Sequence, residues 1–158
     1  MSQNARNFSH SSNFLFTTTL FGEESSYRLQ TVNLPGASFS HIQAGKSAVL
    51  GNFQGDTVTY PSLSVTFIID EQLDTWREII SIVQKMREPE SNEGELVEKW
   101  AFLEIHDDNS NVILKLSFRD IMLESIGDLE FNTTSEDEIL TLDVSMVYDF
   151  YTVEPKIT

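Results

Sequence analysis

Apolar and polar residues alternate along the last forty residues of the chain. From Leu140 to Phe150 every second residue is apolar, and the residues between them are polar except Val147. The segment from Ile121 to Phe131 follows a similar alternation. A period of two is typical of a strand with one buried and one exposed face. The two segments therefore predict a long antiparallel hairpin, joined by the polar connection 132–138.

Similar patterns predict five more strands, over residues 13–20, 27–34, 63–69, 96–105 and 111–118. The clearest is 63–69, where Leu63, Val65 and Phe67 share one face. Residues 36–61 are rich in glycine and show no sustained period. We expect this excursion to be largely irregular, with short strands at 39–43 and 56–60, and to dock on another surface through its apolar residues.

One helix is predicted over residues 71–88. Its apolar residues recur at helical spacing, and Asp70 is placed to cap its first turn. A single helix cannot cover a sheet of seven or more strands. The strands must therefore close on themselves, which predicts a mainly β fold: an antiparallel barrel or sandwich of two packed sheets with one flanking helix. We expect one domain, 14–158, after a flexible arm, 1–13, rich in Ser and Asn.

Charge narrows the classes of function. The 158 residues carry a formal net charge of −15. Such a chain lacks the basic footprint that binds nucleic acid through phosphates, and it does not favour anionic membranes. It has no cysteine, and it shows neither a secretion signal nor an apolar run long enough to span a membrane. We therefore expect no membrane anchor and synthesis in the cytoplasm.

The sequence offers no catalytic, cofactor-binding or metal-binding site. Gly45-Lys46-Ser47 lacks the first glycine of a phosphate-binding loop, and the acidic run 107–111 fits a hairpin turn better than a calcium loop. The three histidines, His10, His41 and His106, have no partner at metal-ligand spacing. We predict that the chain is not an enzyme and that it uses no cofactor.

Acidic residues dominate the C-terminal end. From Asp120 to Thr158 there are ten acids and one base, Lys156. Five acids are candidates for the exposed face of the predicted hairpin: Glu124, Asp128, Glu130, Asp143 and Asp149. Such a face suits a surface that keeps a polyanion away. The alternative is that these acids face bulk solvent and serve solubility.

The order of these features resembles the tail tube proteins of contractile-tailed bacteriophages and, more distantly, the tube protein of the type VI secretion system. The resemblance spans residues 14–153. It rests on Leu34-Pro35-Gly36, the glycine-rich excursion, the strand 63–69 leading through Asp70 into the Trp76-containing helix, Ile126–Phe131, and the final strand ending in Tyr148-Asp149-Phe150-Tyr151.

The resemblance implies a structural virion protein whose six copies form rings that stack into the inner tube of a phage tail. Phage DNA would pass through the tube without specific binding, and the five acids would line the lumen. The excursion 42–61 would make the ring-to-ring contact, through Gly45, Lys46, Val49, Leu50 and Phe53. Tail sheath, tape-measure and baseplate proteins would be the partners.

Three other readings stay open. The chain could be a ring of the same fold that begins or ends the tube in a baseplate or terminator, or a type VI secretion tube protein. It could also be a monomeric β-barrel that binds a small ligand. That reading needs a cavity with converging polar groups, whereas the strand patterns place only apolar residues inward.

Overall fold

The computed structural model describes residues 13–21, 24–46, 48–87, 99–132, 134 and 138–154. They form ten strands and one helix: β1 (Asn13–Thr18), β2 (Ser25–Val32), β3 (Ser38–Lys46), β4 (Val49–Thr59), β5 (Leu63–Ile68), α1 (Asp74–Arg87), β6 (Trp100–His106), β7 (Val112–Arg119), β8 (Met122–Ile126), β9 (Thr141–Val147) and β10 (Phe150–Val153). The predicted mainly β fold with one helix is confirmed. The predicted arm lies outside the described residues except for Asn13, as do His10, the end of the helix at residue 88 and most of the connection 132–138.

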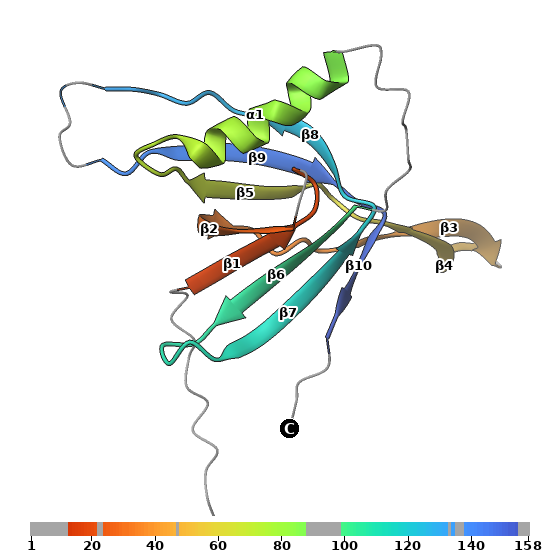
Figure 1. The fold of residues 1–158 in the computed structure, drawn as a ribbon. Coiled ribbons are helices and arrows are strands. Elements are labelled where there is room, and N and C mark those ends of the chain that lie inside the picture. Colours follow the sequence, from red (N-terminus) through yellow and green to blue (C-terminus); the bar gives the residue numbers. More distant parts are fainter. Residues whose placement is uncertain are drawn as a thin grey trace, which may run out of the picture.

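Eight strands form one antiparallel sheet in the order β10-β7-β6-β1-β2-β5-β9-β8. The sheet folds over, so that β10, β7, β6 and β1 form one layer and β5, β9 and β8 the other (Figure 1). Strand β2 serves both layers: its first half pairs with β1, its second half pairs with β5, and a register shift follows Leu29, at the start of the second half. A bulge of this kind bends a strand, which lets β2 pass from one layer to the other.

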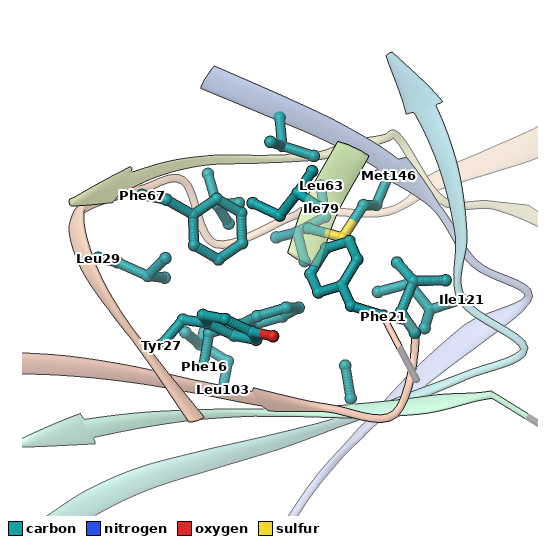
Figure 2. Packing of buried hydrophobic residues seen from close by; sticks show 14 of the residues in the cluster. Phe16, Phe21, Tyr27, Leu29, Leu63, Phe67, Ile79, Leu103, Ile121 and Met146 are labelled. Atoms are coloured by element: carbon teal, nitrogen blue, oxygen red, sulfur yellow. The ribbon is translucent and has the colours of Figure 1, made fainter. Parts of the chain in front are cut away.

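The core fills the space between the two layers. Phe16, Phe67 and Phe118 are fully buried, and Phe67 makes edge-to-face contacts with the rings of Phe16 and Tyr27. Figure 2 shows Phe67, Tyr27 and Phe21 packed together with Leu63, Met146 and Ile79 of the helix. The predicted inward residues of the strand 63–69 are all buried, because their alternation matches the pleat.

Helix α1 lies against the layer of β5, β9 and β8 and buries Ile79 and Ile82 (Figure 1). It begins at Asp74, three residues later than predicted. Leu73 has a φ of 60°, which is incompatible with a helical turn and delays the start. Asp70 nevertheless caps the helix, since its carboxylate accepts the amides of Asp74 and Thr75. No helix in the described part of the chain is long and apolar enough to cross a membrane.

The expectation that residues 36–61 are largely irregular is wrong. They contain the two longest strands of the molecule, β3 and β4, which pair in near-continuous register from Ser38 opposite Thr59 to Lys46 opposite Val49. These strands could not be predicted from the sequence, because neither face of the hairpin is buried. Without a buried face, folding does not impose an alternation of apolar and polar residues.

The final predicted strand, 139–150, is also wrong at its end. Strand β9 stops at Val147, and the chain turns at Tyr148 and Asp149 to enter β10, which pairs with β7 in the other layer. The preceding strand is shorter than the predicted 121–131, because β8 ends at Ile126. The antiparallel pairing of β8 with β9 is confirmed.

Candidate assembly surfaces

Strands β3 and β4 form a projecting hairpin, residues 38–59, that extends away from the barrel (Figure 1). These two strands are hydrogen-bonded only to each other. Large apolar side chains on the hairpin are nevertheless open to solvent, with Val49, Leu50 and Phe53 exposed by 70%, 68% and 50%. A stable soluble monomer rarely exposes such a cluster, so the hairpin has the character of an interaction surface.

The register divides these apolar residues between the two faces of the hairpin. Ile42 lies opposite Phe53, and Ala44 lies opposite Gly51. Residues two apart share a face, so the apolar residues Ile42, Ala44, Val49 and Phe53 lie on one face, to which the position of Lys46, opposite Val49, also belongs. Leu50 is opposite Gly45 and lies on the other face. Four of the five predicted contact residues are therefore exposed at the outer half of the hairpin; the side chain of Lys46 lies outside the described residues.

Aromatic side chains hold the base of the hairpin on the barrel. The hydroxyl of Tyr151 in β10 donates to the carbonyl oxygen of Pro35, just before β3, at 2.9 Å. Tyr60, just after β4, contacts the rings of Tyr148 and Tyr151 with centroids 5.9 and 5.3 Å apart. Contacts on both hairpin ends fix the direction in which it projects.

The outer face of β2, β5 and β9 is polar. Thr31 donates to the Thr66 hydroxyl at 2.9 Å, and Thr66 donates to the Asp143 carboxylate at 2.7 Å. Thr66 and Asp143 alternate with the buried residues of β5 and β9, so they point away from the core, and the register shift after Leu29 brings Thr31 opposite Thr66 on the same face. They form a hydrogen-bonded row across three strands.

Glu124 lies beside this row, on β8. Its carboxylate accepts the Ser145 hydroxyl at 2.8 Å. Hydrogen bonds from Ser62 and Ser145 hold the pKa of Glu124 below its usual range, so the carboxylate stays charged on this face.

The five predicted acids are not all brought together. Asp128, Glu130 and Asp143 line one cleft with Glu138, and Glu124 lies nearby through Ser145 of β9. Asp149 lies apart, in the turn between β9 and β10, where its amide donates to the carbonyl oxygen of Arg119. The break in the final strand removes Asp149 from the face that the alternation predicted.

Sequence reasoning did not include Thr66, Thr31 and Glu138 in this surface. The signal for Thr66 was present, since Ser64 and Thr66 alternate with the inward residues of the strand 63–69. Glu138 follows the polar connection that begins at residue 132, and no periodic pattern of the sequence fixes its position relative to Asp143.

Other polar features have structural explanations. The Asp107 carboxylate accepts the amides of Asn109 and Asn111, which makes the run 107–111 a hairpin turn, as predicted. The Asn111 amide is the main reason that the pKa of Asp107 lies below its usual range. His41 is exposed, and His106 contacts Glu104 at 3.2 Å. No group of three or more potential metal ligands occurs among the described residues.

Comparison with known proteins relates the fold to a class. No family model and no curated protein sequence matches the chain. Several solved structures are similar over nearly all of it. Three of them are the sheath/tube terminator of PVC, an extracellular contractile injection system (TM-score 0.69, 10% identity, 96% of this chain and 99% of the other), the baseplate of the anti-feeding prophage (0.66, 10%, 98% and 97%) and the tube-terminating cap of the same prophage (0.63, 15%, 99% and 100%).

The chain therefore has the fold of tube-like components of contractile injection systems. This is the fold of the contractile tail tube family, to which the sequence features pointed. At identities of 10% to 15% the comparison defines the architecture, and the role of the chain rests on its surfaces.

Proposed function

We propose that this chain is a structural subunit of a contractile injection system, and that its copies form hexameric rings that build the inner tube. The observation that carries the proposal is the projecting hairpin, whose apolar face is not covered by any other part of the chain that the structure describes. The shared fold supports it, because the similar structures are described as parts of tube, baseplate and cap assemblies. The proposed role is mechanical and requires no enzymatic turnover.

The polar face is the proposed lining of the tube. Glu124, Asp128, Glu130 and Asp143 would face the lumen and keep an anionic cargo such as DNA from adhering to the wall. Repulsion acts over about 8 Å at physiological salt, which is a large part of a narrow channel. Asp149 belongs to this lining only if a neighbouring subunit brings its turn to the same face.

The projecting hairpin is the proposed contact between successive rings, through Gly45, Lys46, Val49, Leu50 and Phe53. Burial of apolar area is worth roughly 25 cal/mol per Å², so a few exposed side chains of this size contribute substantially to a contact repeated around a ring. Tail sheath, tape-measure and baseplate proteins are the further proposed partners in a phage-tail-like particle.

A ring that begins or ends the tube is the second candidate. It is favoured by the similar structures themselves, which are described as a baseplate, a terminator and a cap. A type VI secretion tube protein would have the same ring architecture. The monomeric binding module is less well supported, because fully buried apolar side chains fill the space between the two layers.

Negative-stain electron microscopy of the purified protein, together with mass measurement in solution, tests this proposal. Stacked tubes with a central hole would support a tube subunit. Single rings that do not stack would support the initiator or terminator. A monomer at high concentration, with or without baseplate components added, would contradict ring formation.

A further inference from the structure

An open apolar groove runs between α1 and the chain that leaves β8. Leu73, Trp76 and Val83 line the helix side, and Leu129 and Phe131 line the other. Its volume is about 650 Å³. Phe131 is 64% exposed and Val83 41% exposed, so the groove is not sealed by the described residues. The described part of the chain therefore leaves two apolar surfaces open: this α1–β8 groove and the apolar face of the projecting hairpin.

The two surfaces cannot meet within one chain. The hairpin projects from one end of the barrel, at the right of Figure 1, whereas α1 lies along the layer of β5, β9 and β8. The hydrogen bond from Tyr151 to Pro35 and the ring contacts of Tyr60 hold the base of the hairpin on the barrel. A hairpin that occupies the groove must therefore come from another molecule.

Charge favours the hairpin as the occupant of the groove. The whole chain has a net charge of −15, and Glu124 and Asp128 stand at the groove. Residues 38–59 carry one acid, Asp56, and one base, Lys46, and so have no formal net charge. Like charges across an interface weaken association, so an uncharged apolar segment is the part of this chain that can approach an acidic rim.

We propose that the apolar face of the projecting hairpin, formed by Ile42, Ala44, Val49 and Phe53, inserts into the α1–β8 groove of a second copy of this chain. Each copy then offers one hairpin and one groove, which is a head-to-tail contact. Such contacts close into rings or continue as stacks. This inference rests on the proposed function, which supplies the self-assembly. It adds the surface of the second copy to which the hairpin binds.

Cysteine cross-linking tests the contact, because the natural chain has no cysteine. Two variants, Val49→Cys in the hairpin and Val83→Cys in the groove, are mixed under assembly conditions and treated with a short bismaleimide. The expected product is a dimer that contains one copy of each variant. The matched control replaces Val83→Cys with Thr152→Cys, at an exposed position on β10, and yields no such dimer.

The results separate this inference from the proposed function. Rings that form without the mixed dimer, or in which Val49→Cys links only to itself, overturn the inference and leave the ring proposal standing. A mixed dimer without rings supports the inference and counts against the rings. If Val83→Cys is labelled equally by a monofunctional maleimide in rings and in monomers, the groove stays open, which overturns the inference. Poor labelling in the monomer means that another segment of the chain fills the groove, which also overturns it.

Polar substitutions provide a second measurement. Phe53→Ser and Phe131→Ser change side chains that are exposed in the single chain, so folding is retained. Each is expected to weaken self-association about tenfold or more, as removal of a central apolar contact does, and the double variant to be little worse than either. The control is Phe150→Ser on β10, 45% exposed, which leaves association unchanged. Additive effects of the two substitutions would contradict direct contact.

Discussion

At the scale of single residues, the aromatic cluster at the base of the projecting hairpin determines how this protein presents its main surface. Phe118 and Tyr148 contact each other with ring centroids 4.9 Å apart, and Tyr60 and Tyr151 complete the cluster. The hydroxyl of Tyr148 is buried without a hydrogen-bond partner among the described residues, whereas that of Tyr151 is bonded to Pro35. Two tyrosines in one cluster thus have opposite hydrogen-bonding states.

Substitution of each tyrosine by phenylalanine separates these states. Tyr148→Phe removes an unpaired buried hydroxyl and is expected to raise the free energy of unfolding by about 1 kcal/mol. Tyr151→Phe removes a made hydrogen bond and is expected to lower it by about 1 kcal/mol. Chemical denaturation of both variants measures the difference. Equal destabilisation would mean that Tyr148 has a partner in solution.

Alkaline pH gives an independent measure of the same residue. Burial, with a smaller effect of the neighbouring tyrosines, raises the pKa of Tyr148 from 10.0 to about 12. A raised pKa in the folded state contributes stability that is complete below the ordinary pKa and is lost as pH rises toward the folded pKa. We expect stability to fall between pH 10.0 and about 12, and less steeply in Tyr148→Phe. Denaturation curves at several pH values in this window test this.

At the scale of elements, helix α1 depends on a cap that its own first turn does not supply. Asp70 lies before the turn that contains Leu73, yet its carboxylate reaches the amides of Asp74 and Thr75 at 3.2 and 3.1 Å. These bonds, that from Thr75 foremost, keep the pKa of Asp70 below its usual range. The cap links strand β5 to the helix that covers its layer.

Removal of the cap tests its contribution. Asp70→Ala is expected to lower the stability at neutral pH, as the loss of a helix cap does, whereas Glu71→Ala, at an exposed neighbour, should leave it close to unchanged. A depressed pKa contributes stability that is present above the ordinary value and lost as pH falls through the folded value. The difference between the two variants should therefore shrink as pH falls below the ordinary pKa of 3.8 and vanish below the lower pKa of the folded state. A difference that is independent of pH would contradict capping by the carboxylate.

The projecting hairpin has its own structural requirement at Gly55. A Cβ at this position would collide with the side chain of Ser40, in the register shift between Phe39 and His41. The Ser40 hydroxyl accepts the amide of Thr57 there, so the side chain is not free to move aside. This bulge sets the twist of the outer half of the hairpin.

Gly55→Ala is therefore expected to disturb the hairpin and reduce self-association while the barrel keeps its stability. Gly36→Ala is the matched control, because nothing lies within 4 Å of a Cβ there. Amide hydrogen exchange over β3 and β4, together with sedimentation, measures both effects. Unchanged exchange in Gly55→Ala would show that the bulge absorbs the methyl group.

At the scale of the whole molecule, the acids of the polar face would affect the stability of the proposed ring. The proposed ring would place Glu124 and Asp143 of each subunit around one channel, so their repulsion opposes assembly. Salt screens this repulsion. Added salt should therefore favour rings.

Neutral replacements that keep the hydrogen-bond acceptors test this view. The double variant Glu124→Gln and Asp143→Asn is expected to assemble at low salt and to lose most of the dependence on salt. Glu71→Gln, an exposed acid before α1, should leave that dependence unchanged. Sedimentation at low and high salt provides the measurement. If assembly of the double variant and of Glu71→Gln depends on salt to the same extent, the acids affect assembly through the total charge of the chain and not through a shared lumen.

Much of the fold was predictable because burial imposes a pattern on sequence. The strand 63–69, the pairing of β8 with β9 and the helix were predicted from residues whose faces meet the core, such as Val65, Met146 and Ile79. The hairpin of β3 and β4 was not, because its side chains have no buried face to mark their period. The turn at Tyr148 and Asp149 was missed because the apolar alternation of the sequence runs on to Phe150, whereas in the structure Phe150 is 45% exposed and Tyr151 is half-buried.

The candidate surfaces were likewise predictable in part. The sequence identified the acids and the apolar residues of the excursion, since these depend on residue type. It could not group Asp128, Glu130 and Asp143 with Glu138, or separate Asp149 from them. Their grouping depends on strand pairing between segments that lie apart in the chain.

By itself, the sequence determined the class of fold, the acidic character and the position of the helix, because side-chain polarity and periodicity act locally. Only the tertiary structure decided that residues 38–59 form a projecting hairpin, that β10 joins β7 after leaving β9, and that the α1–β8 groove is open. These features arise from contacts between distant segments. The free energy of such contacts depends on which strands pair, and the pairing cannot be inferred from a local sequence pattern.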